Sequence, residues 1–164
     1  MRTLVDKDGG VARMSLPLAQ RAAPPAAAAF EATISAFWLN AERAAKKLRR
    51  GEVYEAKRRC DDVMKARLLQ MIEWHARARH GGDYDTWHVG RFIETWADPR
   101  ALAGLRDTYA RYEAGDIARA LLATMGLFRA LAVETAGALG YPYPALIDER
   151  LTRWVGACLA GDDC

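Results

Sequence analysis

The sequence has few cysteines, no long apolar run and little net charge. Its 164 residues include 3 cysteines with no C-x-x-C pair, so we expect neither a disulfide framework nor a zinc ribbon. The most apolar stretch, residues 117–139, still contains charged side chains, and no apolar leader opens the chain, which predicts a cytoplasmic protein without a membrane span. A net charge of +3 excludes a histone-like polycation.

Common catalytic motifs are also missing. There is no Walker loop, no G-x-G-x-x-G, no G-x-S-x-G and no H-E-x-x-H. His75 lies on an apolar helical stripe, which is typical of a core histidine. Two D-x-D pairs each lie beside two glycines, and aspartate in such turns usually bonds its own backbone rather than a metal. Function must therefore be sought in other patterns.

Helical periodicity dominates the chain from residue 24 onward. Apolar residues recur three or four positions apart, and glycine or proline marks the boundaries between the periodic stretches. We predict an all-α fold, a helical bundle of four main helices plus one short helix, with Asp116 capping a long helix that runs to about residue 139. The four main helices are predicted at residues 24–50, 52–79, 116–139 and 145–160 and the short helix at 90–97, with a further helical stretch at 100–113.

The first residues differ from the rest. Leu4 and Val5 end at an Asp-Lys-Asp-Gly-Gly turn, which is typical of a β-strand and its exit. We therefore divide the chain into a strand-like extension with a linker, residues 1–23, and a helical domain, residues 24–164.

Basic residues crowd between positions 43 and 59. Such a run indicates either a solvated helix face or a surface that holds phosphate groups, because closely spaced cations bind polyphosphates well. Nucleic acid is a weaker interpretation, since no nucleic-acid motif accompanies the run. The run consists of Arg43, Lys46, Lys47, Arg49, Arg50, Lys57, Arg58 and Arg59.

Aromatic residues are more plentiful, with 5 tryptophans. Trp38 falls on a helix face and suits packing, whereas Trp87 and Trp96 bracket the loop segment, where they could form a wall of a ligand cleft.

An ordered series of segments runs through the chain: LVDKDG, FWLNAERAAKKLRRGEVYEAK, LLQMIEW, GRFIETW, LRDTYARYE and MGLFRALAVETAGALGYPYP. In order and spacing these segments resemble the C-terminal part of bacterial aminoglycoside 6-adenylyltransferases, the streptomycin-adenylylating family of antibiotic-resistance enzymes. The resemblance covers roughly residues 3–158.

The resemblance implies a two-domain nucleotidyltransferase that moves AMP from ATP to an aminoglycoside hydroxyl and releases pyrophosphate. In that family an upstream domain carries the Gly-Ser and paired aspartates that bind Mg²⁺ and ATP, and the helical domain forms the other wall of the cleft. We therefore assign no catalytic or metal-binding residue to this chain. We expect it to be inactive alone and to bind no cofactor strongly by itself, and Asp6 and Asp8 are not the catalytic pair.

The resemblance also suggests binding residues. Lys46 matches a family lysine suited to contacting the triphosphate, and Arg91 matches a lysine of a Gly-Lys motif, so both are predicted to bind nucleotide. Trp38 is predicted to shape the cleft beside Lys46. Because aminoglycosides are polycations, the drug-binding wall needs carboxylates. The predicted substrate-binding residues are Trp38, Asp61, Asp62, Asp83, Asp85 and Trp87, with Glu73 and Glu94 as further nearby acids.

Two other hypotheses stay open. The chain could be a non-catalytic helical module that docks a separately encoded nucleotidyltransferase domain or self-associates into a homo-oligomer. It could also be a helical RNA-binding module that uses the cations of residues 43–59.

Overall fold

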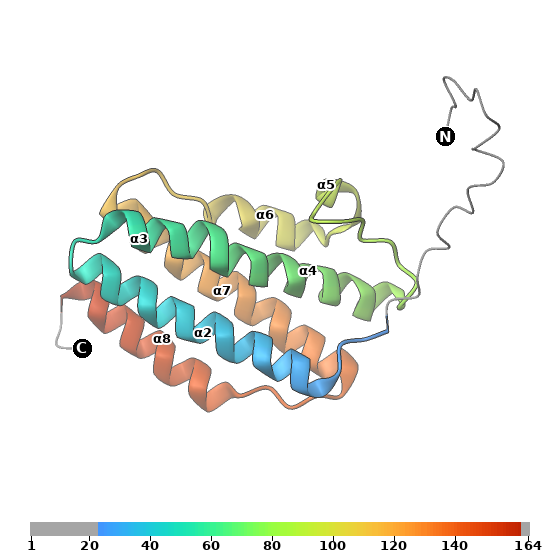
Figure 1. The fold of residues 1–164 in the computed structure, drawn as a ribbon. Coiled ribbons are helices and arrows are strands. Elements are labelled where there is room, and N and C mark those ends of the chain that lie inside the picture. Colours follow the sequence, from blue (N-terminus) through green and yellow to red (C-terminus); the bar gives the residue numbers. More distant parts are fainter. Residues whose placement is uncertain (1–22, 162–164) are drawn as a thin grey trace, which may run out of the picture.

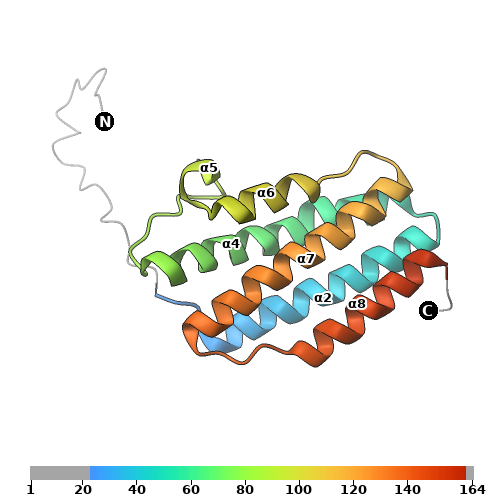
Figure 2. The same ribbon diagram turned by 180° about the vertical axis from the view of Figure 1, so that it is seen from behind.

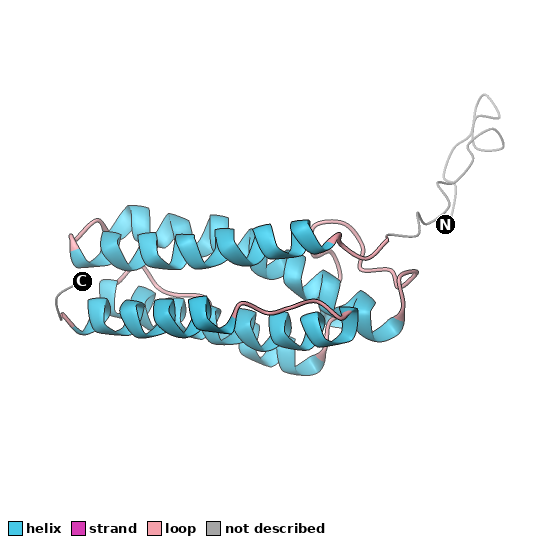
Figure 3. Ribbon diagram, turned by 90° about the horizontal axis from the view of Figure 1, so that it is seen from below, coloured by secondary structure: helices cyan, strands magenta, loops and turns pink. Residues whose placement is uncertain are grey.

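The computed structural model describes residues 23–161, and all regular structure in that range is helical (Figures 1 and 3). The all-α prediction is confirmed. The predicted strand-like extension falls almost wholly on residues 1–22, which lie outside the described range. The helices are α2 (Ala27–Arg49), α3 (Val53–Arg58), the π-helical η1 (Arg59–Met64), α4 (Lys65–His80), α5 (Ile93–Trp96), α6 (Pro99–Asp107), α7 (Ala114–Leu139) and α8 (Ala145–Ala160).

Four long helical rods form the bundle: α2, the uninterrupted run α3–η1–α4, α7 and α8 (Figure 1). The main contacts join α4 to α7, and α2 to both α8 and η1. The short helices α5 and α6 lie on the outside, with α6 packed along α7 (Figure 2). No helix within the described residues is long and apolar enough to cross a lipid bilayer.

The core forms where the apolar stripes of these rods meet. Phe37 of α2 and Phe128 of α7 stack with ring centroids 3.6 Å apart and planes only 4° from parallel. Trp38 meets Phe37 edge-on at 5.6 Å and is itself 1% exposed. His75 is also buried, as its place on the apolar stripe predicted. Other large core side chains are Phe30, Ile34, Met64, Leu68, Met71, Ile72, Ile117, Leu121 and Met125.

The π-helical segment η1 resolves a mismatch in the apolar stripe. Ala56, Cys60, Met64 and Leu68 are all buried, and each lies four residues after the one before. In an α-helix each step of four turns about 40° beyond a full turn, so three such steps would carry the stripe off the core. A π-helical turn contains more residues and rotates less per residue, so η1 keeps the stripe facing inward.

Helix α6 is shorter than predicted, ending at Asp107 instead of near residue 113. The Thr108 hydroxyl donates to the Leu105 carbonyl at 2.7 Å, a local bond that competes with helix continuation. Arg119 of α7 then donates to the carbonyl oxygens of Asp107 and Tyr109, at 2.8 and 2.9 Å. These side-chain bonds satisfy the carbonyls that a longer helix would have used.

The predicted capping role of Asp116 is wrong. Helix α7 begins at Ala114 after Glu113, and Asp116 lies inside its first turn. The Asp116 carboxylate accepts from the Arg111 backbone N–H and from Arg119 Nε, both at 2.7 Å. It therefore stabilises the preceding loop and the positive end of the helix dipole.

The Phe37–Phe128 contact predicts a large stability effect. Phe37→Ala should lower the free energy of unfolding by about 3–5 kcal/mol, because it leaves a cavity at the centre of the core. The exposed Leu39 on the same helix is a matched control, and Leu39→Ala should cost less than about 1 kcal/mol. Urea unfolding followed by circular dichroism measures both; equal losses would contradict this description of the core.

Candidate functional site

A groove lies between the η1–α4 segment and the loop that follows α4. Its volume is about 340 Å³. Two carboxylates and one lysine contribute its charged groups, and the remaining wall is largely apolar, a combination that suits a ligand with both charged and apolar faces. The lining residues are Asp61, Asp62, Lys65, Ala66, Leu69, Ile72, Val89, Gly90, Ile93, Leu105 and Tyr109.

The two predicted acids of η1 meet at this groove. Asp61 forms an ion pair with Lys57 through Oδ2, while its Oδ1 is buried and has no hydrogen-bond partner within residues 23–161. Asp62 is open to solvent, with 74% of its side chain exposed and Arg58 Nη1 4.0 Å from its Oδ2. The groove thus has one partly buried and one exposed carboxylate side by side.

Lys65 is the residue that sequence reasoning missed. It is 8% exposed, and its Nζ donates to the Cys60 carbonyl at 3.3 Å and to Thr124 Oγ1 at 3.1 Å. The ammonium also lies 5.1 Å from the centre of the Tyr109 ring, a cation–π contact. Burial lowers the Lys65 pKa, against the opposing influence of Cys60 and Asp61. In the sequence, the sign that Lys65 is buried was its place directly after Met64, a residue of the apolar stripe.

The loop over the groove has an unusual backbone. Trp87, Val89 and Phe92 all have left-handed φ values, of 53°, 54° and 56°. Such a conformation costs roughly 1–2 kcal/mol for each residue with a side chain, so packing must hold it. Part of that packing is the close approach of the loop backbone to α4 at Gly90. A Cβ at this position would lie only 3.2 Å from Leu69 Cδ1.

The same loop contains further predicted site residues. Asp85 accepts the Trp87 backbone N–H at 2.8 Å, which is the turn chemistry expected of this D-x-D pair. The exposed rings of Trp87 and Phe92 meet edge-on at 4.9 Å, and the Arg91 guanidinium lies 5.5 and 4.8 Å from their centres. Asp83 is exposed in the turn just after α4. Loop and η1 thus bring aromatic, basic and acidic groups to one side of the bundle.

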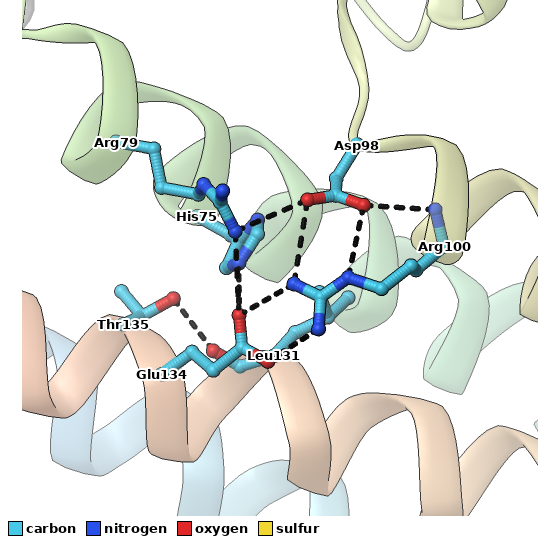
Figure 4. A network of polar contacts seen from close by, with 7 residues as sticks. All are labelled: His75, Arg79, Asp98, Arg100, Leu131, Glu134 and Thr135. Carbon is cyan, nitrogen blue, oxygen red and sulfur yellow. Dashed lines mark hydrogen bonds and ion pairs between the residues drawn. The ribbon is translucent and has the colours of Figure 1, made fainter.

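A polar network fixes α6 beside the groove (Figure 4). His75 Nε2 is 2.9 Å from Glu134 Oε2 and must donate, because a carboxylate only accepts. Arg100 donates to both Glu134 oxygens, at 3.2 and 3.1 Å, and its backbone N–H is capped by Asp98 at 2.8 Å. Arg79 reaches Asp98 at 3.2 Å. The network therefore joins α4, α6 and α7, and α6 supplies Leu105 to the groove.

Lys46 and Trp38 lie away from the groove. Lys46 is in the last turn of α2, pairs with Glu42 at 2.6 Å and lies 5.2 Å from the Trp154 ring centre. Trp38 is in the core, with the Arg129 guanidinium 5.5 Å from its ring centre. The C-terminal end of α2 and the short helix α5 lie at opposite ends of the bundle, so the structure does not bring Lys46 and Arg91 together (Figures 1 and 2).

The basic run at residues 43–59 is extensively paired with acids. This pattern favours a solvated face with internal ion pairs over an open phosphate-binding surface. The pairs are Lys46–Glu42, Lys47–Glu52, Arg50–Glu52, Lys57–Asp61, Arg58–Glu55 and Arg58–Asp62.

Comparison with known proteins identifies the class to which this helical domain belongs. The family model for streptomycin adenylyltransferase matches residues 1–157, and the chain belongs to that family.

Individual relatives agree with this membership. The chain is 25% identical over 157 residues to an aminoglycoside 6-adenylyltransferase of Campylobacter jejuni, covering 94% of this chain and 54% of that protein. It is 24% identical over 130 residues to an aminoglycoside 6-adenylyltransferase of Bacillus subtilis strain 168, covering 79% and 45%. The chain therefore spans about half the length of these relatives.

A solved structure shares the fold. The crystal structure of an aminoglycoside 6-adenyltransferase from Bacillus subtilis superposes with a TM-score of 0.73 at 22% identity, covering 82% of this chain and 51% of that one.

The polar network in Figure 4 predicts a pH effect on stability. The hydrogen bond from His75 holds the Glu134 pKa below its usual value, with Arg100 adding to the effect. A carboxylate with a lowered folded pKa stabilises above its unfolded pKa, and that contribution is lost as the pH falls through the folded value. The stability difference between wild type and Glu134→Gln should thus be larger at about pH 5 than at about pH 3.

Denaturant unfolding at the two pH values measures this difference. Glu94→Gln is the control, because Glu94 is exposed in α5 outside this network, and its difference should not change with pH. If the stability difference between wild type and Glu134→Gln stays constant or grows as the pH is lowered, the network does not have this role.

Proposed function

We propose that this chain is the helical, substrate-binding part of an aminoglycoside adenylyltransferase. In the whole enzyme AMP passes from ATP to a drug hydroxyl, and a nucleotidyltransferase domain of the kind outlined above holds ATP and Mg²⁺. Family membership over residues 1–157 and the half-length match to 6-adenylyltransferases support the proposal. Among residues 23–161 no group of three metal-ligating side chains gathers.

The groove beside η1 is the proposed drug site. Aminoglycosides carry several ammonium groups and sugar rings with apolar faces. Asp61 and Asp62 offer carboxylates to the ammonium groups, and the exposed Tyr109 ring offers a flat surface to a sugar. The observation that carries the proposal is the meeting of these two acids and an exposed aromatic ring in one groove of a chain from this family. Asp83, Asp85 and Trp87 would extend the site along the loop.

Lys46 and Arg91 are the proposed nucleotide contacts. Both are exposed, so each can approach a phosphate. Because they lie at separate places on the bundle, each requires its own test by substitution with alanine.

Transfer of AMP provides the functional test. The chain would be fused behind the nucleotidyltransferase half of the Bacillus subtilis relative, and transfer of radiolabelled AMP from ATP to streptomycin would be measured. The fusion should transfer AMP, whereas the chain alone and that half alone should not. Asp62→Asn should lower kcat/KM about tenfold through the loss of one charge contact, roughly 1.4 kcal/mol.

Glu149→Gln is the matched control, because it removes an exposed carboxylate from α8, away from the groove, and should leave kcat/KM unchanged. An equal loss in both variants would remove the groove from the proposal. A fusion that folds but transfers no AMP, alongside an active whole Bacillus subtilis enzyme, would contradict the proposed function.

A further inference from the structure

The groove has an internal division of charge. Of the described residues that line it, Lys65 is the only cation, and the two carboxylates lie beside it on η1. Asp62 is exposed, whereas Lys65 is almost wholly buried. A ligand entering the groove therefore meets negative charge at its rim and a positive charge at its floor.

The positive charge at the floor is held in place. Thr124 donates its own hydroxyl proton to the Ala120 carbonyl at 2.7 Å, so its oxygen is free to accept from Lys65 Nζ. The Cys60 carbonyl accepts a second bond, and the Tyr109 ring covers another side of the ammonium. These partners on η1, α7 and the segment after α6 hold the ammonium at the floor of the groove.

The charge of Lys65 is also not cancelled directly. Within residues 23–161 no carboxylate is in ion-pair contact with Lys65: Asp61 pairs with Lys57 and attracts the Lys65 ammonium only from a longer distance. The partners of the ammonium are neutral groups that solvate it without removing its charge. A second cation brought to the floor would therefore face repulsion in a partly dehydrated site, where charges act more strongly than in water.

We propose that Lys65 is a specificity-determining residue that keeps cationic groups off the floor of the groove. The inference rests on the proposed function, since it concerns how the same groove sorts aminoglycosides. A polycationic ligand is bound with its ammonium groups at Asp61 and Asp62 and with a hydroxyl-bearing part at the floor. There the ligand hydroxyl can accept a hydrogen bond from the Lys65 ammonium or pack beside it. An analogue with an amine in place of that hydroxyl is disfavoured.

The size of the effect follows from Coulomb's law. Two unit charges about 6 Å apart at an effective permittivity of about 20 repel strongly enough to change an affinity roughly a hundredfold. Water that enters the groove weakens this repulsion, so we expect a selectivity of at least about fivefold to depend on the Lys65 charge.

Calorimetric titration of the 164-residue chain with kanamycin A and kanamycin B tests the inference. Kanamycin B carries an amine where kanamycin A carries one hydroxyl. The dissociation constant of kanamycin B divided by that of kanamycin A should fall at least about fivefold in Lys65→Met and in Lys65→Gln, because both variants lack the charge. Lys65→Gln retains an amide donor, so a change shared by both variants reports on charge rather than on a lost hydrogen bond.

Two controls separate charge from other effects. Lys65→Arg keeps the charge and should keep the wild-type ratio. Lys47→Met removes a lysine of the last turn of α2 that does not line the groove, and it should also keep that ratio. Melting curves confirm that each variant is folded before titration. An unchanged ratio in folded Lys65→Met and Lys65→Gln would overturn the inference alone. Failure of both kanamycins to bind a wild-type chain that binds streptomycin would also overturn the inference alone, whereas failure of streptomycin to bind would overturn the proposed drug site.

Discussion

The groove depends on the packing of the 53–80 helical run against α7. Apolar side chains of both elements form the core between them, and the Lys65–Thr124 hydrogen bond joins them at the edge of that core. The π-helical turn η1 makes this packing work over its full length, because it rotates the chain less per residue and so keeps Cys60 and Met64 inward. As a result, Asp61 and Asp62 point away from the core toward the groove.

Charge in this domain is mostly neutralised close to where it occurs. Most cations of residues 43–59 pair with acids nearby in the sequence. The network of Figure 4 pairs two arginines with two carboxylates around a buried histidine. Against that background the groove stands out, since Asp61 Oδ1 has no hydrogen-bond partner among the described residues and the Asp62 side chain is largely exposed. Unbalanced charge at a concave surface is what recognition of a polycation requires.

Much of the fold could be predicted from periodicity, and its exceptions have local causes. The last helix, predicted at 145–160, matches α8, because its apolar spacing and its flanking prolines agree. The π-helical turn was visible in principle as three consecutive steps of four, from Ala56 to Leu68. The end of α6 was not, because it depends on Arg119, which lies twelve residues beyond Asp107 and folds back onto its carbonyl.

The candidate site was predictable in composition but not in geometry. Asp61 and Asp62 were expected at a drug-binding wall, and the structure places both in one groove. The family resemblance predicted that Lys46 and Arg91 both bind nucleotide. Only the three-dimensional structure shows that the two residues lie in different places on the bundle. Lys65 was missed because a lysine beside an apolar stripe usually extends to water, whereas here Lys65 donates a hydrogen bond to Thr124 on α7, 59 residues further along the chain.

The central claim is that the groove beside η1 is where this domain meets an aminoglycoside. Backbone amide chemical-shift mapping during a streptomycin titration tests it most directly. The shifting amides should cluster at residues 60–66, 87–93 and 105–109, with α8 unaffected. Shifts concentrated on α8 and the C-terminal half of α2, with the groove unchanged at saturation, would contradict it.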